Sequence, residues 1–348
     1  MHQKPVHVIT DARVLRTGFV PQEVTHRDTE VTHLTEILSP LTDGNPAETT
    51  LLTGPSGAGK TCLAKYTAEQ LRQEVLDVEY QYVNCWQNFS EFRTLYRILE
   101  GLGKTVDIHR QLTPRDELFE RLRQYDGPPC VVILDEADQL EEKRLLYHLH
   151  ELPQFSMLLI ANREQDLFAT ADERLTSRLT GCEQVRFDRY SADELVAIMN
   201  ARVKAGLEEG VIAQDQLATI ADAAAGDARV ALSILRTAAR QAHRDYQERI
   251  TNELIKAAMP RARAERYQND LDTLTPHQRT LYEIIEEHGE ILPSALYEEY
   301  TERIDDPKTD RTVRNYLSKM NQYDVIEAAG TSRDRTYRSL SETFDHSN

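Results

Sequence analysis

Short apolar runs and stretches of helical spacing alternate along the first half of the chain. Four apolar or β-branched runs predict buried strands, at residues 49–53, 78–83, 130–134 and 157–161. Helical spacing of apolar residues separates them, at residues 31–41, 62–74, 89–102 and 115–125. Strands that alternate with helices predict the α/β class, with a parallel sheet covered by helices on both faces.

After residue 190 the helical spacing continues without strands. It runs over residues 192–205, 215–224, 227–243 and 251–264, and a charged stretch follows. The end of the chain predicts three helices and then two short strands, which is the order of a winged helix. We therefore expect an α/β domain, a helical lid, a linker and a winged-helix domain, at residues 1–189, 190–264, 265–274 and 275–348.

Composition narrows the class of protein. The 348 residues include 58 acidic and 41 basic side chains, which gives a formal net charge of −17, and only nine of the basic residues are lysine. An acidic, lysine-poor surface is typical of proteins from very salty cells, and an ordinary acidic protein is the alternative. Four scattered cysteines without a CxxC pair argue against a zinc site or a disulfide framework and favour a reducing cytoplasm. No apolar run is long enough to span a bilayer, so we expect no membrane partner.

The clearest chemical signal follows the first predicted strand. The pattern GxxxxGK[ST] is matched in full by Gly54, Pro55, Ser56, Gly57, Ala58, Gly59, Lys60 and Thr61. Glycines let backbone N–H groups point at phosphates, Lys60 adds a positive charge, and Thr61 offers a hydroxyl to Mg²⁺. The helix that continues through Cys62 directs its positive end at the same place. A simple glycine-rich loop would not explain Lys60 and Thr61, so the motif predicts a site for ATP or ADP with Mg²⁺.

A second motif closes the third predicted strand, where an apolar run ends in Asp135 and Glu136. At this place Asp135 would bind Mg²⁺ and Glu136 would polarise the attacking water. Alone the motif is weak, because apolar runs that end in acids are common. Here the motif follows the phosphate-binding loop with one predicted strand between them, and in this context it predicts ATP hydrolysis.

Together the two motifs resemble the AAA+ ATPases. The resemblance implies that Asn162, after the fourth strand, orients the lytic water, and that Arg229 in Gly226-Asp227-Ala228-Arg229 senses the γ-phosphate from the lid. It also implies an arginine finger for a neighbouring subunit, with Arg178 as first choice and Arg174 as second. The alternatives are a polar strand cap for Asn162, a solvated helix arginine for Arg229, and surface ion pairs for the other two.

The segment at residues 19–27 resembles the "YxPxxLPHR" segment of the archaeal initiators related to origin recognition complex subunit one and cell division control protein six. In that family the segment lines the adenine pocket, which implies a nucleotide contact for Val20, His26 and Arg27. The same resemblance brings Tyr190 and Arg202 to the nucleotide from the lid. A packed aromatic side chain and a surface cation are the alternatives for these two residues.

The third domain resembles the winged helix of the same family, at residues 274–279 and 310–317. Arg311, Arg314 and Asn315 fall at i, i+3 and i+4 of the recognition helix and suit guanine and adenine edges. The candidate phosphate or minor-groove contacts of the wing are Arg333, Arg335 and Arg338. The candidate phosphate contacts of an inserted element at residues 89–112 are Arg93, Arg97 and Arg110. A winged helix that binds protein, and an exposed charged helix in the insertion, are the alternatives.

The resemblance implies an ATP-dependent initiator of DNA replication that binds double-stranded origin DNA. It further implies self-association on DNA, recruitment or loading of the replicative helicase, and slow ATP hydrolysis used as a switch. The wing has few glycines, so a divergent paralog remains open beside the main initiator. Two functions of other classes also remain open: a winged-helix transcription regulator with structural ATP, and a clamp-loader-like ATPase that acts on protein partners.

Overall fold

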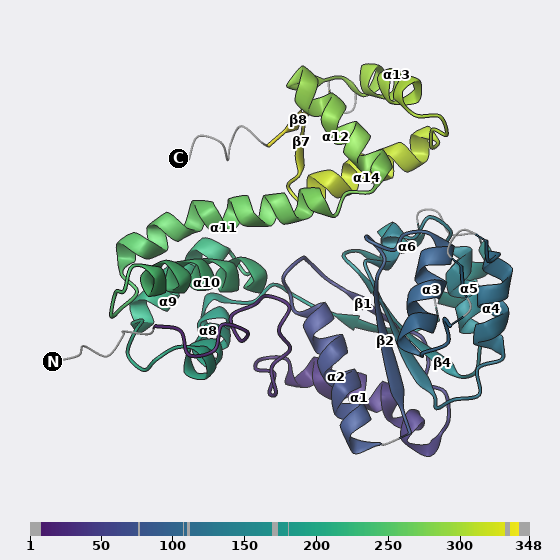
Figure 1. Cartoon of the computed structure of the whole chain (residues 1–348), viewed down its shortest axis with the longest axis horizontal. Helices are drawn as coiled ribbons and strands as arrows, with labels where there is room; N and C mark the ends of the chain where they lie inside the picture. Colours follow the sequence, from purple (N-terminus) through teal and green to yellow (C-terminus); the bar gives the residue numbers. More distant parts are fainter. Residues whose placement is uncertain are drawn as a thin grey trace. The chain divides into compact units, whose positions relative to one another are not determined.

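The computed structural model describes residues 8–75, 77–106, 108–109, 112–168, 173–179, 181–330 and 335–340, without the side chains of residues 173–175 and 269. The chain divides into two compact units, Met1–Ile255 and Lys256–Asn348, and each is described by itself (Figure 1). Among the described residues, no helix combines the length and the apolarity that a bilayer crossing requires.

The first unit is built on a five-stranded sheet in the order β2-β3-β4-β1-β5, in which every pairing is parallel. The strands are β1 (Thr50–Thr53), β2 (Glu79–Asn84), β3 (Cys130–Asp135), β4 (Phe155–Ala161) and β5 (Glu183–Arg186). All residues of β3 and β4 are buried, as expected for central strands that are covered on both faces. The carboxyl ends of β1, β3 and β4 meet at one edge of the sheet.

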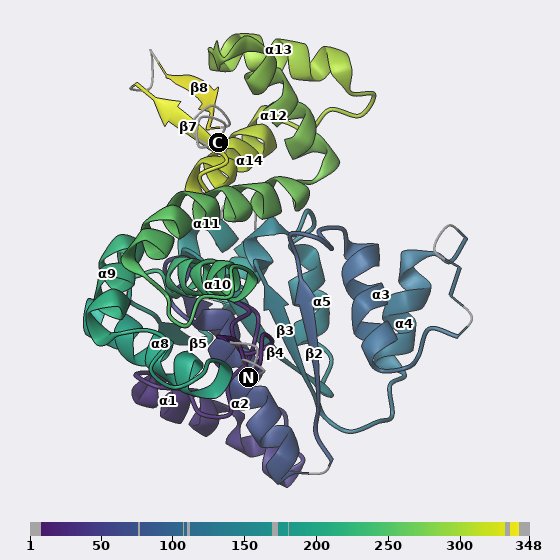
Figure 2. The same cartoon turned by 60° about the vertical axis from the view of Figure 1, so that its left-hand side comes forward.

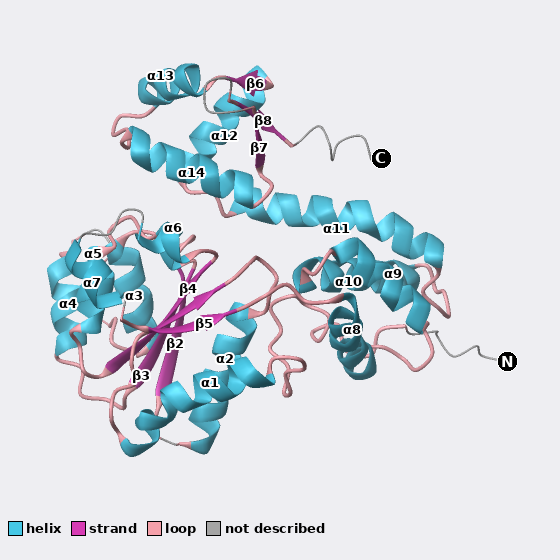
Figure 3. Cartoon of the chain, turned by 180° about the vertical axis from the view of Figure 1, so that it is seen from behind, coloured by secondary structure: helices cyan, strands magenta, loops and turns pink. Residues whose placement is uncertain are grey.

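Alternate residues of the strands point to opposite faces of the sheet and enter two separate cores. Leu52 and Ile133 belong to the core beneath α1 and α2, whereas Leu51 and Leu134 belong to the core on the opposite face. Figures 2 and 3 show helices on both sides of the sheet. One face carries α1 (Asp28–Leu38), the short 3-10 helix η1 (Ser39–Asp43) and α2 (Lys60–Glu74). The remaining helices are α3 (Glu91–Gly101), α4 (Arg115–Arg123), η2 (Ala137–Gln139), α5 (Arg144–His150), α6 (Glu164–Phe168) and α7 (Glu173–Leu179).

Three helices of the lid complete the first unit: α8 (Ala192–Gly206), α9 (Gln214–Ala224) and α10 (Ala228–Arg244). Ser191 and Glu194 form a reciprocal capping box at the start of α8, and Asp227 caps α10. The N-terminal segment lies on this lid, because the amide of Thr10 donates to the carbonyl of Gly206 (3.0 Å).

The second unit is a small helical domain with a three-stranded antiparallel sheet in the order β6-β8-β7. Its elements are α12 (Pro276–His288), β6 (Glu290–Ile291), α13 (Pro293–Arg303), α14 (Asp310–Gln322), β7 (Ile326–Ala329) and β8 (Thr336–Ser339). Leu281, Leu296, Leu317 and Tyr337 are buried and bring helices and sheet together in one core. The three helices and the two strands β7 and β8 follow in the predicted order, with β6 added between α12 and α13.

The predicted linker at residues 265–274 is not an extended segment. Residues 265–272 lie in α11 (Asn252–Asp272), which crosses the division between the two units. The charged residues that suggested a linker, such as Arg263 and Glu265, are also good helix formers whose heads remain in solvent on a helix surface. The predicted domain limits at residues 189, 264 and 274 stay a prediction.

The α/β class is confirmed, but two strands of the structure were not predicted. In β5 only Val185 is buried, so this edge strand has almost no apolar signal. The other strand, β6, is two residues long and is defined by its pairing with β8. In both cases pairing with another segment, rather than local pattern, makes the strand.

Candidate functional site

The phosphate loop (residues 54–61) leaves β1 and enters α2, and it requires glycine at two positions. Gly57 and Gly59 have positive φ angles of 74° and 96°. A Cβ added at Gly57 would lie 1.9 Å from Oδ1 of Asp227, and one at Gly59 would lie 2.4 Å from the hydroxyl of Tyr190. The lid and the segment before it therefore pack directly against the loop, with no room for a side chain.

Lys60 is buried and directs its ammonium group into this loop. Its Nζ donates to the carbonyls of Gly54 (2.6 Å) and Pro55 (2.9 Å) and to Oδ1 of Asn162 (3.1 Å). Asn162 follows β4, the strand beside β1, so two residues that the sequence singled out separately, Lys60 and Asn162, come together at the edge of the sheet. The first turn of α2 lies at the same place, and its unpaired N–H groups and positive end favour an anion there.

Asp135 at the end of β3 faces Thr61 from the phosphate loop. One oxygen of Asp135, Oδ2, accepts hydrogen bonds from the hydroxyls of Thr61 (2.9 Å) and Tyr82 (2.8 Å). Burial, and then the neighbouring Glu136 carboxylate, raise the pKa of Asp135 above its usual value. A hydroxyl and a buried carboxylate side by side are hard oxygen ligands, so this pair fits Mg²⁺.

Tyr82 was not among the predicted site residues. It lies on β2, where it pairs with Ile133 of β3 two positions before Asp135. The ammonium of Lys65 lies 3.3 Å from the centre of its ring. The sequence showed only that residue 82 belongs to a strand; the register with β3 is what places its hydroxyl on Asp135.

The start of α10 reaches the phosphate loop from the lid. The guanidinium of Arg229 donates to Oγ of Ser56 (2.5 Å), and the amide of Ala228 donates to the carbonyl of Gly57 (3.1 Å). Asp227 accepts from the amides of Arg229 (2.8 Å) and Val230 (3.2 Å) through Oδ1. The structure thus brings Arg229 to the phosphate loop, and its role as a sensor of the γ-phosphate stays a prediction.

Arg27 joins the segment at residues 19–27 to the phosphate loop. Its side chain is buried, and Nη2 donates to the carbonyls of Ala58 (3.1 Å) and Asp188 (2.7 Å). The guanidinium lies 4.2 Å from the centre of the Tyr190 ring. His26 beside it is exposed and Val20 is half-buried. Arg27 therefore links the backbone of the phosphate loop to that of the segment after β5.

Arg202 does not donate to the phosphate loop, although we predicted that it approaches the nucleotide. It is buried, and it donates to the carbonyls of Val14 (3.2 Å) and Phe19 (2.9 Å). Burial raises the pKa of half-buried Cys62, and the nearby charge of Arg202 acts in the opposite direction. A long side chain on α8 can reach either the loop or the N-terminal segment, and the structure places it on the segment.

The first-choice arginine finger lies on α7. Arg178 pairs with Glu151 (2.6 Å), and its guanidinium lies 4.8 Å from the centre of the Tyr147 ring. Its side chain is half exposed. The side chain of Arg174, the second choice, lies outside the described residues.

In the second unit α14 exposes the predicted DNA-contacting residues. Arg311, Arg314 and Asn315 are exposed, whereas Val313 and Leu317 of the same helix are buried. The three polar side chains therefore share the face of α14 that is turned away from the core.

The wing carries one exposed arginine and one that is already paired. Arg335 is exposed just before β8. Arg338 on β8 forms an ion pair with Glu327 on β7 (2.6 Å). Arg333 lies outside the described residues. A phosphate contact by Arg338 requires that the phosphate replace Glu327.

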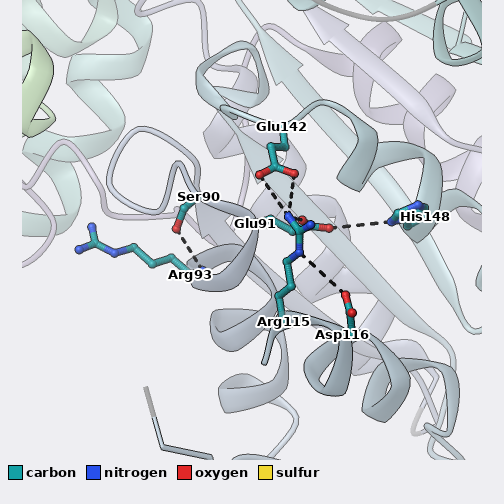
Figure 4. A network of polar contacts seen from close by, with 7 residues as sticks. All are labelled: Ser90, Glu91, Arg93, Arg115, Asp116, Glu142 and His148. Carbon is teal, nitrogen blue, oxygen red and sulfur yellow. Dashed lines mark hydrogen bonds and ion pairs between the residues drawn. The ribbon is translucent and has the colours of Figure 1, made fainter. Parts of the chain in front are cut away.

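The inserted helices α3 and α4 are held together by charged side chains. Figure 4 shows Arg115 between Glu91 (3.2 Å) and Glu142 (3.1 Å), with His148 on the far side of Glu91 (3.9 Å). Burial, and then Glu142, raise the pKa of Glu91. Arg93 points away from this network (Figure 4).

The three arginines predicted as DNA contacts in the insertion have different surroundings. The guanidinium of Arg93 lies 5.3 Å from the centre of the Phe89 ring. Arg97 pairs with Glu100 (2.5 Å) on the same helix. Arg110 lies outside the described residues. Of the two that are described, Arg97 is already paired with an acid.

Comparisons with known proteins agree with this architecture. A family model described as an AAA domain matches residues 45–170, and one described as a Cdc6 AAA+ ATPase-type lid domain matches residues 196–260. ORC1-type DNA replication protein 9 of Halobacterium salinarum is 56% identical over 339 residues, which are 97% of this chain and 96% of that protein. This chain belongs to the ORC1-type DNA replication proteins. ORC1-type DNA replication protein 1 of the same organism is 56% identical over 308 residues, 88% of this chain and 100% of that protein.

Solved structures give the same result for this ORC1-type chain. It is similar to the Aeropyrum pernix ORC1 protein in complex with DNA, with a TM-score of 0.74 and 25% identity over 98% of this chain and 96% of that one. The Aeropyrum pernix ORC2 protein, in ADPNP–ADP complexes, shares the fold with a TM-score of 0.64 and 21% identity over 95% and 94% of the two chains. The predicted AAA+ fold with a helical lid and the predicted family are confirmed.

Proposed function

We propose that this ORC1-type protein is an ATP-switched initiator that binds duplex DNA at a replication origin and helps recruit or load the replicative helicase. One observation carries the proposal: Asn162 and Arg229, from two distant parts of the chain, converge on the phosphate loop that contains Lys60. Such convergence lets one group, a bound triphosphate, set the contact between sheet and lid.

The residues of the loop fit a nucleotide. The N–H groups of the loop and of the first turn of α2 would bind phosphate oxygens, and Lys60 would exchange its carbonyl partners for them. Arg27, Tyr190 and the segment that contains Val20 and His26 would enclose the base. Thr61 and Asp135 would bind Mg²⁺, which supplies positive charge to the phosphates. A side chain has no room at Gly57 or Gly59. This supports a loop whose backbone approaches its neighbours closely.

Hydrolysis would be slow and would serve as a switch. Glu136 would accept a proton from the attacking water, and Asn162 would orient that water. Arg178, or else Arg174, would supply positive charge to a neighbouring copy on DNA, which makes full activity depend on self-association. The ion pair between Arg178 and Glu151 would have to open for this contact.

The lid would report the state of the nucleotide. Arg229 binds Ser56 of the phosphate loop at the position from which a γ-phosphate can compete for its guanidinium. A ligand that contacts Arg229 in one state and lacks that contact in the other shifts the balance between two lid positions. ATP and ADP would therefore favour different lid positions.

The second unit would bind the DNA. The exposed face of α14 offers Arg314 and Asn315, which suit base edges in the major groove, and Arg335 lies on the wing for a phosphate. The structure of the Aeropyrum pernix ORC1 protein in complex with DNA supports DNA as the partner.

Duplex binding with ATP and with ADP tests the proposal. We expect nuclease footprinting on the region upstream of the protein's own gene to show a protected site whose extent or strength differs between the two nucleotides. Arg314→Ala should weaken the binding of duplex DNA by about 1–3 kcal/mol and should relax the sequence specificity at one base. Arg72→Ala, which removes an arginine paired with Glu69 on α2, is the matched control. A clamp-loader-like ATPase would leave the duplex unprotected, and a transcription regulator would bind it equally with ATP and ADP.

A further inference from the structure

A cavity of about 250 Å³ lies in the first unit between the N-terminal segment and α10. It is lined by Ile9, Ala12, Leu15, Arg16, Arg236 and Arg240. The lining thus combines three apolar residues with three arginines. None of its lining residues belongs to the phosphate-loop site described above.

The helix that forms this wall has an unusual charge for this protein. In a chain with 58 acidic residues, α10 contains none, and it carries four arginines, at positions 229, 236, 240 and 244. Steps of seven, four and four residues place all four on one stripe of the helix. The opposite side of α10 is filled by buried residues such as Leu235 and Ala239. The stripe therefore carries no acid, and Arg240 and Arg244 at its C-terminal end are exposed.

Two arginines of the cavity, Arg16 and Arg240, differ from Arg13 in their surroundings. Arg13, close by in sequence, is engaged by both oxygens of Asp11 (3.0 and 2.8 Å). In the part of the chain that the structure describes, Arg16 and Arg240 form no ion pair, and Arg240 is exposed. Two guanidinium forks thus remain available to an anion from outside.

We infer that this cavity and the exposed end of the arginine stripe of α10 bind the sugar–phosphate backbone of DNA. This would be a second DNA contact, in addition to the one proposed for the winged helix. A guanidinium fork matches two oxygens of one phosphate, and neighbouring arginines on the stripe match a polymer with regularly spaced charges. The apolar wall of Ile9 and Leu15 matches the carbon face of a deoxyribose, which a free inorganic phosphate lacks. The inference rests on the proposed DNA binding and adds the lid to it.

The position of α10 couples this grip to the nucleotide. Arg229 in the first turn of this helix contacts the phosphate loop. The segment that supplies Arg16 is held by Arg202 of the lid through the carbonyls of Val14 and Phe19. One wall of the cavity, α10, therefore belongs to the lid, and the other, the N-terminal segment, is hydrogen-bonded to it. If the lid moves when ATP is replaced by ADP, the residues that contact the DNA backbone move with it.

The salt dependence of DNA binding tests the inference. A labelled duplex from the region upstream of the gene is titrated with the protein by fluorescence anisotropy, in ATP, at a series of KCl concentrations. Each phosphate contact contributes about 0.9 to the slope of log K against log salt. We expect Arg16→Ala/Arg240→Ala to reduce the magnitude of the slope by about two, and Arg240→Ala alone by about one. Arg240→Lys keeps the charge and should keep the slope, and Arg72→Ala should match the parent protein.

Three results would overturn the inference. The first is that Arg16→Ala/Arg240→Ala leaves the slope unchanged while Arg314→Ala still weakens DNA binding. This result would leave the proposed function intact and would assign the cavity to some other anion, such as an acidic peptide. The second is a slope in Arg240→Lys as low as in Arg240→Ala, which would show a packing effect. The third is that the parent protein does not bind the duplex, which would remove the proposed function as well. Arg240 and Arg16 are exposed, so these variants are expected to fold.

Discussion

Replacement of Gly57 by alanine tests how the lid is attached to the phosphate loop. Gly57 has a φ of +74°, and the added Cβ would lie 1.9 Å from Oδ1 of Asp227. That oxygen accepts the amides of Arg229 and Val230 at the start of α10. The side chain of Asp227 must therefore move, and the helix cap is lost together with the contact that brings Arg229 to the loop.

Two costs add in this variant. A left-handed backbone costs an alanine about 1 kcal/mol relative to glycine. Loss of an aspartate cap costs about 1 kcal/mol more. Gly57→Ala should thus lower the free energy of unfolding by about 2 kcal/mol. Gly210→Ala is the matched control, because Gly210 has a φ of +75° and nothing within 4 Å of an added Cβ. It should lose only about 1 kcal/mol.

Urea unfolding of a double-mutant cycle separates the two costs. Asp227→Ala alone should lose about 1 kcal/mol through the missing cap. In the Gly57→Ala background the cap is already gone, so the same substitution should cost almost nothing further. The reasoning is refuted if Asp227→Ala costs the same in both backgrounds, or if Gly57→Ala loses no more than Gly210→Ala.

Three other variants address the switch, the insertion and the finger. Arg229→Ala should reduce the preference for ATP over ADP by about tenfold in equilibrium binding, since a hydrogen bond to a charged group is worth about 1.5–3 kcal/mol; an unchanged ratio contradicts it. Arg115→Ala leaves Glu91 and Glu142 without their shared cation. Because the pKa of Glu91 is already raised by burial and by Glu142, the loss in melting temperature should be larger at neutral pH than in mild acid, where Glu91 is protonated, and a pH-independent loss would count against this. Arg178→Ala should retain ATP binding and lose the part of the ATPase rate that rises with protein concentration on DNA; a rate that keeps this rise assigns the finger elsewhere.

The elements that the sequence predicted best are those with a local signal. The strands β3 and β4 are continuous buried runs, and the phosphate loop needs glycine, lysine and threonine at fixed spacing. Edge strand β5 has one buried residue and gave no such signal. The charged C-terminal half of α11 suggested a linker because charge and helix propensity coincide in arginine and glutamate.

Within the site, the sequence singled out residues at fixed positions in motifs, but not their partner Tyr82, which lies in no motif. Lys60, Asp135, Asn162 and Arg229 lie at the loop because each follows a strand end or a cap that the sequence marks. Tyr82 reaches Asp135 only through strand register, which no local pattern encodes.

Long side chains show the same limit. Arg27 and Arg202 could each have contacted a nucleotide or the protein backbone. Only the packed structure shows that both donate to main-chain carbonyls, Arg27 beside the phosphate loop and Arg202 on the N-terminal segment.

The central claim is that the loop around Lys60 binds the phosphates of a nucleotide. Equilibrium titration with labelled ATP and Mg²⁺ tests it most directly, on the parent protein, on Lys60→Ala and on Lys204→Ala as a lysine control from the lid. We predict saturable binding with one nucleotide per chain for the parent and for Lys204→Ala, and loss of binding for Lys60→Ala. Absence of saturable binding in the parent, or equal binding in all three proteins, would contradict the account.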